Sequence, residues 1–270
     1  MSWSGIKKAI NRAGAQVMLK TGHIEETVDK EYEFEEKRYR QMEKTSTQLQ
    51  KELKHYLESL RILSNAQVSV SEILSQFYGS EAKNDYSHKY RSVSEEYHQI
   101  MNSINTKSLA DLEQPYNQTV LNPISKFNSY YIEINDAIKK RNHKKIDYDA
   151  MKSKVRRMIE KPSTDQSYDG KLSQSQAQLT TLQQSYDTLN DQLKQELPKL
   201  SDLCTPFLDP SFEAFVKLQL RFFNDNYNQL NNLQMKLDAK SREDYINGSL
   251  DEKIDNVLIK MKELNITGAT

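Results

Sequence analysis

Lysine and arginine side chains are concentrated in one stretch of the sequence, between Lys139 and Lys161. Ten bases and three acids stand there, which leaves seven positive charges over 23 residues in a chain whose net charge is zero. The ten bases are Lys139, Lys140, Arg141, Lys144, Lys145, Lys152, Lys154, Arg156, Arg157 and Lys161. Phosphate groups neutralise such a cluster, and each base near an anionic lipid leaflet contributes about 1 kcal/mol to binding. We expect these ten residues to bind anionic lipid; a merely solvated helix face is the alternative.

A second basic segment, residues 1–20, contains four bases and no acid. If the segment is helical, its apolar residues fall on one narrow side at about 100° per residue. These apolar residues are Trp3, Ile6, Ile10, Ala13 and Val17, and the bases around them include Lys7, Lys8 and Arg12. An amphipathic helix of this kind lies in the plane of a membrane interface. We predict that the apolar residues insert into a membrane and that the bases bind its lipid; a packed helix at the start of a bundle is the alternative.

The residues that usually carry catalysis or hold metals are scattered. The sequence contains no glycine-rich phosphate loop, no His-Glu-x-x-His and no Gly-x-Ser-x-Gly motif. The five histidines lack the spacing of a metal site: His23, His55, His88, His98 and His143. The one cysteine, Cys204, is better explained as a small apolar residue than as a nucleophile. We therefore predict no catalytic residue, no metal and no cofactor.

Signals for insertion across a membrane or for secretion are missing from the sequence. No stretch approaches about 18 consecutive apolar residues, and the N-terminus lacks the apolar region of a signal peptide. Motifs for myristoylation and prenylation are also missing. A single cysteine suits a reducing compartment. We therefore expect a cytoplasmic protein that attaches to a membrane from its periphery.

The composition favours long helices over a large compact core. Apolar residues make up 36% of the chain, and glycine and proline number only seven and six. The mean hydropathy is −0.83. A β-rich fold would need more turn residues, and periodic apolar residues argue against disorder. The sequence therefore predicts an all-α fold whose helices bury narrow apolar stripes.

Apolar residues recur with the spacing of a coiled coil over three long segments. The predicted helices span residues 28–77, 86–159 and 172–237. We expect them to pack antiparallel, with a loop after Gly79 and a turn at residues 160–167. The predicted organisation is an N-terminal amphipathic helix at 1–22, a helical bundle at 23–240, and a short C-terminal helix with a tail at 241–270.

Prolines interrupt the second and third predicted helices, because proline removes a helical hydrogen bond. Pro115 and Pro123 predict kinks or a short break in the second helix. Three prolines are expected to bend or break the third: Pro198, Pro206 and Pro210. A short fourth helix is predicted after Ser249, with Ser249 and Glu252 spaced as a capping box.

The apolar stripes are more generous than one three-helix bundle needs. Aromatic and aliphatic residues are dense from Tyr32 to Tyr56 and from Phe212 to Phe223. Dimerisation through the bundle is the expected way to bury the excess. Nucleic acid could also neutralise the basic segment. We expect no nucleic acid partner, because the sequence has no RNA-recognition signature, zinc-ligand pattern or compact helix-turn-helix.

Several motifs, taken in order and spacing, resemble the fungal amphiphysin-type N-BAR proteins over essentially the whole chain. Residues 1–14 are similar to the first helix of these proteins, and residues 137–145 to their basic motif. The match continues through residues 29–32, 154–157, 209–214 and 219–222. Among these proteins the chain resembles the short members that lack an SH3 domain. We expect no SH3 domain in this chain, because the sequence up to Thr270 shows no proline-rich linker and leaves no room for an SH3 barrel.

This resemblance implies a BAR domain, in which three long kinked antiparallel helices form a crescent-shaped dimeric coiled-coil bundle behind an amphipathic helix. It implies a non-enzymatic scaffold that senses or generates membrane curvature through a basic concave face and the inserted helix. The implied partners are an anionic phospholipid membrane, a second copy or a longer SH3-containing BAR protein, and indirectly the actin patch machinery. The implied role is in endocytosis and cortical actin organisation, at cortical actin patches.

A protein of another class would use the same helices. A helical scaffold that binds only proteins, such as a cytoskeletal tether, would leave both basic segments solvated or facing proteins. Salt-sensitive binding to anionic lipid separates the two hypotheses, because only the membrane scaffold needs contacts with phosphate.

Overall fold

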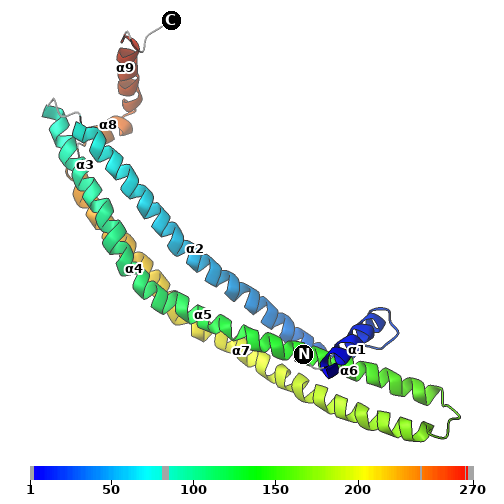
Figure 1. The fold of residues 1–270 in the computed structure, drawn as a ribbon. Helices are drawn as coiled ribbons and strands as arrows, with labels where there is room; N and C mark the ends of the chain where they lie inside the picture. The colour runs from blue at the N-terminus through cyan, green and yellow to red at the C-terminus, as the bar shows by residue number, and fades with distance from the viewer. Residues whose placement is uncertain (1–2, 81–84, 238, 265, 267–270) are drawn as a thin grey trace. The chain divides into compact units, whose positions relative to one another are not determined.

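The computed structural model describes residues 3–80, 85–237, 239–264 and 266, whose regular structure is entirely helical (Figure 1). For residues 3–8, 80, 85–89 and 241 it describes the backbone alone. In chain order the elements are α1 (Trp3–Lys20), α2 (Lys30–Ser80), α3 (Asp85–Ser103), η1 (Ile104–Ser108), α4 (Leu109–Tyr116), η2 (Asn117–Leu121), α5 (Asn122–Ser129), α6 (Tyr131–Glu160), α7 (Tyr168–Gln234), α8 (Lys240–Ile246) and α9 (Leu250–Lys262). The elements η1 and η2 are single π-helical turns.

The predicted long helices are present. The first is α2, the second is the series of helical segments from α3 to α6, and the third is α7. The predicted turn lies between the end of α6 at Glu160 and the start of α7 at Tyr168, and α2 ends at Ser80, beside the expected stop. The N-terminal amphipathic segment is helical as α1. The loop expected after Gly79 falls on residues 81–84, which lie outside the described residues.

Prolines act differently in the second and third helices. Pro115 lies inside α4, and Pro123 occupies the first turn of α5, directly after the π-helical turn η2. A π turn widens the helix where a proline ring would meet the carbonyl of the preceding turn, so the chain stays helical through Pro123 and no break occurs there. In the third helix α7 continues through all three of its prolines, so none of them ends it.

The predicted capping box at α9 does not form. Ser249 is the N-cap residue of this helix, but its hydroxyl makes no capping hydrogen bond to the helix. The Ser249 hydroxyl donates instead to the backbone oxygen of Asp244, at 3.3 Å. The reason is local, because the end of α8 folds back close enough to compete for the serine.

Contacts divide the chain into two units, each with its own core. Unit 1 comprises Met1–Lys54 and Asn117–Phe215. Its core brings together α2, α5, α6 and α7 around two tyrosines of α2 that are fully buried. The buried residues of this core are Tyr32, Tyr39, Phe127, Tyr131, Ile138, Leu193 and Leu197. Unit 1 therefore holds both basic segments predicted to bind lipid.

Unit 2 comprises His55–Tyr116 and Val216–Thr270. Its core packs the second part of α2 against α3, η1, α4 and the end of α7. The buried residues are Leu60, Met101, Ile104, Leu109, Leu112 and Phe222. The helix α9 also belongs to this unit, and none of its residues is buried.

The apolar stripe of α2 does not face one partner throughout. Every seventh residue from Tyr32 to Leu60 is buried: Tyr32, Tyr39, Ser46, Leu53 and Leu60. In unit 2, other members of the stripe are exposed, with Val70 at 53% and Phe77 at 64%. The end of α7 likewise exposes Leu220 and Tyr227 in unit 2. Unit 2 thus leaves apolar sides of two helices uncovered.

Candidate functional site

The basic stretch forms one continuous helix, α6, and this helix separates its bases onto two sides. At about 100° per residue, four bases fall within a sector of about 100°: Lys139, Lys140, Lys154 and Arg157. All four are exposed. Within the part of the chain that the structure describes, none of the four forms an ion pair. We call them the outward bases.

Two bases away from this sector, Lys144 and Lys145, are held by neighbouring segments of unit 1. Lys145 Nζ lies 2.5 Å from a carboxylate oxygen of Glu26, and only 12% of the lysine side chain is exposed. Lys144 donates a hydrogen bond to the hydroxyl of Ser185 on α7. Lys152 is exposed near the ring of Tyr148. Lys144 and Lys145 are therefore bonded to neighbouring segments, whereas Lys152 remains exposed.

Near the end of α6, Arg156 pairs with two acids, Glu160 at 2.8 Å and Glu25 at 3.4 Å. The pair with Glu160 raises the pKa of Arg156 above its usual value. Both pairs are solvent-exposed, so salt and competing anions weaken them readily. Lys161 is exposed just past the end of α6. Arg156 and Lys161 therefore stay within reach of an anionic surface, although Arg156 would have to exchange partners.

The structure differs most from the sequence-based expectation at Arg141, which lies in the interior with 3% of its surface exposed. Its Nε and Nη2 donate to Asn190 Oδ1 at 3.0 and 2.7 Å, and Nη2 also donates to the Tyr186 hydroxyl at 3.0 Å. The guanidinium carbon lies 3.7 Å from the centroid of the Tyr32 ring. Because its donors point into the bundle, we leave Arg141 out of the lipid-binding set.

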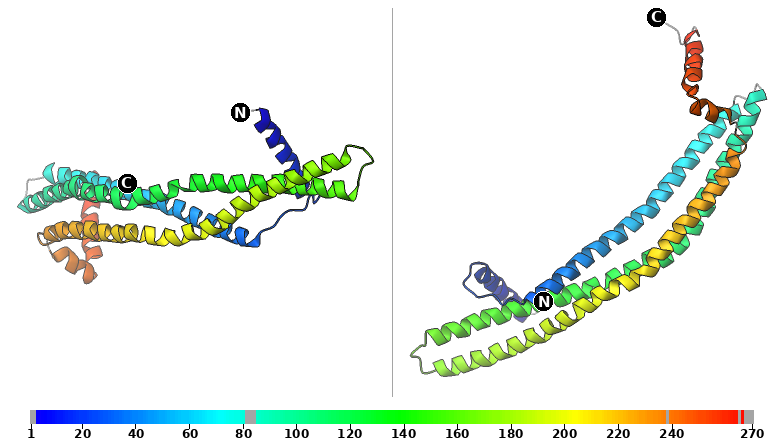
Figure 2. Two further views of the ribbon diagram at one scale, coloured as in Figure 1. Left: turned by 90° about the horizontal axis from the view of Figure 1, so that it is seen from below. Right: turned by 180° about the vertical axis from the view of Figure 1, so that it is seen from behind.

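The N-terminal helix α1 rests on α6 through its second half. Ala15 and Leu19 of α1 pack with Ile146 and Ala150 of α6. Figure 2 shows the first half of α1 extending away from α6 while the second half lies against it. Ile24, which follows α1, is buried in the same apolar cluster. A polar contact lies beside this cluster.

That polar contact is a two-pronged ion pair between Arg12 and Asp147. Arg12 Nε donates to Asp147 Oδ1 at 2.8 Å, and Nη2 donates to Oδ2 at 2.6 Å. The two side chains are 26% and 28% exposed, so the pair is partly shielded from water. The hydrogen bond to Asp147 raises the pKa of Arg12 above its usual value. Arg12 therefore bonds α6 in this structure, where we had expected it to bind lipid.

The opposite side of α1 is apolar and uncovered. Ile10 and Val17 are 65% and 63% exposed, and Ala13 between them is also exposed. At about 100° per residue these three lie roughly opposite Arg12, Ala15 and Leu19. The other predicted residues, Trp3, Ile6, Lys7 and Lys8, have side chains outside the described residues.

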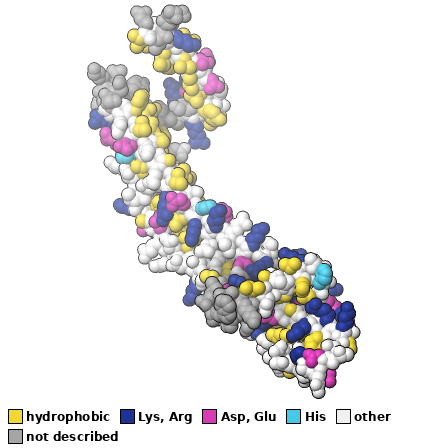
Figure 3. All heavy atoms as spheres, turned by 45° about the vertical axis from the view of Figure 1, so that its right-hand side comes forward, with side chains coloured by type: hydrophobic (Ala, Val, Ile, Leu, Met, Phe, Trp, Pro, Cys, Tyr) yellow, Lys and Arg dark blue, Asp and Glu magenta, His cyan; other side chains and the backbone are white. Residues whose placement is uncertain are grey.

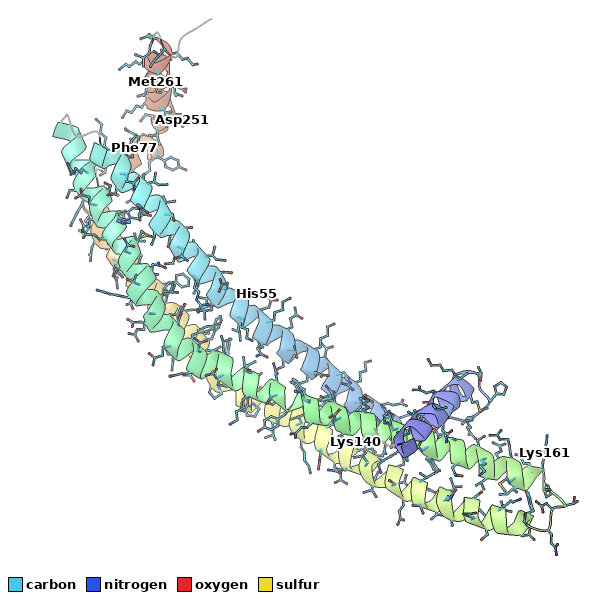
Figure 4. All side chains as sticks on the ribbon, in the orientation of Figure 1. His55, Phe77, Lys140, Lys161, Asp251 and Met261 are labelled. Atoms are coloured by element: carbon cyan, nitrogen blue, oxygen red, sulfur yellow. The ribbon has the colours of Figure 1, made fainter. Side chains whose placement is uncertain are left out.

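The outward bases and α1 share one side of α6. The residues of α6 that meet α1 are Ile146, Asp147 and Ala150, and they lie in the same sector of the helix as the outward bases. Figure 4 shows α1 resting on α6 between the labelled Lys140 and Lys161. Figure 3 turns this end of unit 1 forward and shows lysine and arginine side chains gathered on it. The exposed apolar side of α1 therefore stands among exposed cations.

His143 lies at the edge of this crossing, on the same side of α6. Burial lowers its pKa, and the neighbouring charges of Arg12 and Lys139 lower it further, against a smaller opposite effect of Asp147. A neutral imidazole at neutral pH follows. The positive potential that lowers this pKa is the same potential that would attract phosphate.

The segment between α1 and α2 is fastened to α6 as well. The Thr27 hydroxyl donates to Asp149 Oδ1 at 2.5 Å, and the Thr27 N–H donates to Oδ2 at 3.2 Å. Asp29 then caps α2, accepting from the Tyr32 N–H at 3.1 Å. These contacts fix where α1 leaves the bundle. The roles of Asp147 and Asp149 could not be predicted from the sequence, because the partners of both are more than 100 residues away along the chain.

Two classes of site can be compared with this surface. Within the described residues, no group of three or more His, Cys, Asp or Glu side chains is placed to hold a metal ion. A search of the same residues for a helix long and apolar enough to span a bilayer gives no candidate. The α1–α6 crossing brings exposed apolar residues and exposed cations together.

Comparison with known proteins agrees with this architecture. A family model of the BAR domain matches residues 6–239. The "regulator of cytoskeleton and endocytosis RVS161" of Candida albicans is 46% identical, and the match covers 99% of this chain and 98% of the relative. The "reduced viability upon starvation protein 161" of Saccharomyces cerevisiae is 44% identical over 98% of each chain. The amphiphysin BAR domain from Drosophila shares the fold, with a TM-score of 0.56 and 22% identity over 80% of this chain and 96% of its own.

Proposed function

Because the chain belongs to the BAR domain family, whose members dimerise, bind membranes and sense their curvature, we propose that it is a non-enzymatic scaffold for anionic phospholipid bilayers. The membrane surface in this proposal is the α1–α6 crossing of unit 1. Two sets of residues would contact lipid. The cations are Lys139, Lys140, Lys154, Arg157 and Lys161, with Lys7, Lys8, Lys152 and Arg156 beside them; the apolar residues are Trp3, Ile6, Ile10, Ala13 and Val17.

One observation carries this proposal. The exposed apolar side of α1 and the unpaired bases of α6 lie on the same side of one helix. A protein partner would have to place acids and apolar side chains in one matching arrangement to satisfy both kinds of residue. A bilayer interface offers phosphates and acyl chains within a few ångströms of each other, so both kinds find partners there at once.

The expected energies suit reversible attachment. Four outward bases contribute about 1 kcal/mol each near an anionic leaflet, within a Debye length of about 8–10 Å. Ile10 and Val17 add an apolar term of about 25 cal/mol for each Å² they bury. One protomer would therefore bind weakly. A dimer presents the surface twice, so that the second contact follows at a high effective concentration.

Dimerisation is supported by unit 2, where two helices expose apolar side chains along their length. On α2 these are Ile62, Leu63, Val70, Ile73, Leu74 and Phe77, and on α7 they are Val216, Leu220, Phe223, Tyr227 and Leu230. So many large apolar residues on one unit are typical of an obligate interface. We propose a homodimer, or a heterodimer with a longer SH3-containing BAR protein, as the functional form.

The cellular role follows from relatives. One relative is called a regulator of cytoskeleton and endocytosis. We propose the same setting here, with a cytoplasmic protein that attaches peripherally to membrane at cortical actin patches and links to the actin machinery indirectly. The structure supports the membrane part of this role through the α1–α6 crossing.

Vesicle sedimentation tests the proposal. Wild-type protein is mixed with anionic and with neutral liposomes beside the variant Lys139→Glu/Lys140→Glu. The matched control, Lys37→Glu/Lys44→Glu, makes the same change in charge at two exposed lysines of α2. We expect salt-sensitive binding of wild type and control to anionic vesicles only, with at least tenfold weaker binding of the α6 variant, because two reversed charges remove more than 1.4 kcal/mol. Failure of the wild type to bind would favour the alternative, a helical scaffold or cytoskeletal tether that contacts proteins alone.

A further inference from the structure

The contact between α1 and α6 hides one side of α1 and leaves the other free. The hidden side consists of Arg12, which forms the ion pair with Asp147, and of Ala15 and Leu19, which pack with Ile146 and Ala150. The free side carries Ile10, Ala13 and Val17. A contact that kept α1 from membranes would bury the apolar side. In this structure the contact leaves the apolar side of α1 exposed.

The geometry of the ion pair fixes the rotation of α1 about its own axis. Both carboxylate oxygens of Asp147 accept from Arg12, at 2.6 and 2.8 Å, and a two-pronged arginine–carboxylate pair of this kind holds one orientation. Turning α1 by half a turn would separate the pair and bring Ile10 and Val17 against α6. The bond therefore selects the rotation in which the apolar side faces away from the bundle.

On the basis of the function proposed above, we infer that α1 enters the bilayer while it is still held on α6, with Arg12 and Asp147 as the positioning pair. In this arrangement Arg12 binds Asp147 of α6 and does not bind lipid. Asp147 is an acid in the middle of a basic surface, where by itself it would repel phosphate. The ion pair with Arg12 explains why an acid stands at this position of a basic surface.

A held helix would act differently from one on a free tether. Its insertion point lies at a set place among the outward bases, so headgroup contacts and insertion occur together. Orienting the helix before it meets lipid also removes part of the entropic cost of insertion. The wedge would then transmit force to the bundle, which is what bending a membrane requires and binding to one does not.

A cross-link tests whether α1 has to leave α6. In a Cys204→Ser background, Arg12→Cys and Asp147→Cys are joined by a short bis-maleimide, which replaces the ion pair with a covalent bond. Trp3, the single tryptophan of the chain, reports insertion by a blue shift of its fluorescence. We expect the cross-linked protein to show the blue shift with anionic vesicles and to form tubules. Sedimentation without a blue shift in the cross-linked protein, together with a shift in the uncross-linked one, would overturn the inference while leaving the proposed function intact.

Charge variants supply the second test. Asp147→Asn removes the pair, and Asp136→Asn makes the same charge change at an exposed acid on the same side of α6. We expect both to sediment with anionic vesicles at least as well as wild type, while Asp147→Asn alone loses most of its tubules. The exchange Arg12→Asp/Asp147→Arg should restore them, with helix content checked by circular dichroism. Equal tubulation by Asp147→Asn and Asp136→Asn would overturn the positioning role; loss of sedimentation by wild type would instead overturn the proposed function.

Discussion

The guanidinium carbon of Arg141 lies 3.7 Å from the centroid of the Tyr32 ring, inside unit 1. Two neighbours in the sequence, Lys139 and Lys140, are exposed, because each residue of a helix is turned by about 100° from the next. A run of adjacent bases thus divides between two tasks. One base joins α2, α6 and α7, and the others face outward.

The first prediction concerns Arg141 and the stability of unit 1. Arg141→Met would remove a buried cation–π contact and leave Asn190 and the Tyr186 hydroxyl without their donor. We expect the free energy of unfolding to fall by about 2–4 kcal/mol. Urea unfolding followed by circular dichroism measures it. The matched Lys140→Met should change stability by less than about 0.5 kcal/mol, and equal effects of the two variants would contradict the structural role of Arg141.

The second prediction concerns Asp29, the N-cap of α2. Burial raises its pKa, but hydrogen bonds from Asn190 and the Tyr32 N–H, with Lys194 nearby, outweigh burial and lower the pKa overall. Its contribution to stability is therefore present above about pH 4 and is lost as the pH falls through the lowered pKa. We expect Asp29→Ala to cost about 1–2 kcal/mol at pH 7 and less at pH 2. A cost that stayed constant from pH 7 to pH 2 would argue against an ionised cap.

The third prediction concerns His143, whose pKa is lowered in the folded protein by burial and by Arg12 and Lys139. As the pH drops below about 6.5, the unfolded chain takes up the histidine proton first, so the free energy of unfolding decreases. His143→Gln removes this titration. We expect the loss of stability between pH 7 and pH 5 to be smaller in the variant, as measured by urea unfolding at each pH. A steeper loss in the variant would contradict the lowered pKa.

The fourth prediction concerns the apolar side of α1. Val17→Glu places a charge where the proposal requires contact with acyl chains, whereas Gln16→Glu adds the same charge to the flank of the helix. We expect Val17→Glu to abolish the Trp3 blue shift and to weaken vesicle binding at least tenfold, because a charge costs about 2.5–3.5 kcal/mol at the bilayer centre and tenfold requires only about 1.4 kcal/mol of that cost at the interface. The control should lose only the small amount that one added acid explains. Similar losses in both variants would mean that charge alone matters at this helix.

The fifth prediction concerns the exposed apolar side of α2 in unit 2. Val70→Glu/Phe77→Glu introduces two charges into the proposed dimer interface. We expect the variant to sediment as a monomer in analytical ultracentrifugation, where the wild type sediments as a dimer. Asn65→Glu/Gln76→Glu adds the same two charges at exposed polar residues of α2 in unit 2 and serves as the control for surface charge. A dimeric Val70→Glu/Phe77→Glu would place the interface elsewhere.

The sequence by itself was enough for the helices. The spacing of apolar residues predicted α2 and α7, and it predicted α1 and α9 near the ends, because helical periodicity is a local property that each segment carries. The gathering of bases in α6 was equally plain. Local rules were less reliable at single residues: the Ser249 hydroxyl bonds Asp244 instead of capping α9, and of the bend or break expected at three prolines, no break occurs in α7.

Tertiary structure decided what each base does. A helix turns by about 100° per residue, so consecutive bases point to different neighbours, and the sequence does not say which neighbours stand there. Arg141 met aromatic rings and amides from two other helices, and Arg12 met Asp147, 135 residues away. Such partners depend on which segments the fold brings together. For that reason the sequence could identify a basic, membrane-seeking segment, while only the packed helices separated the cations available to lipid from those that hold the protein together.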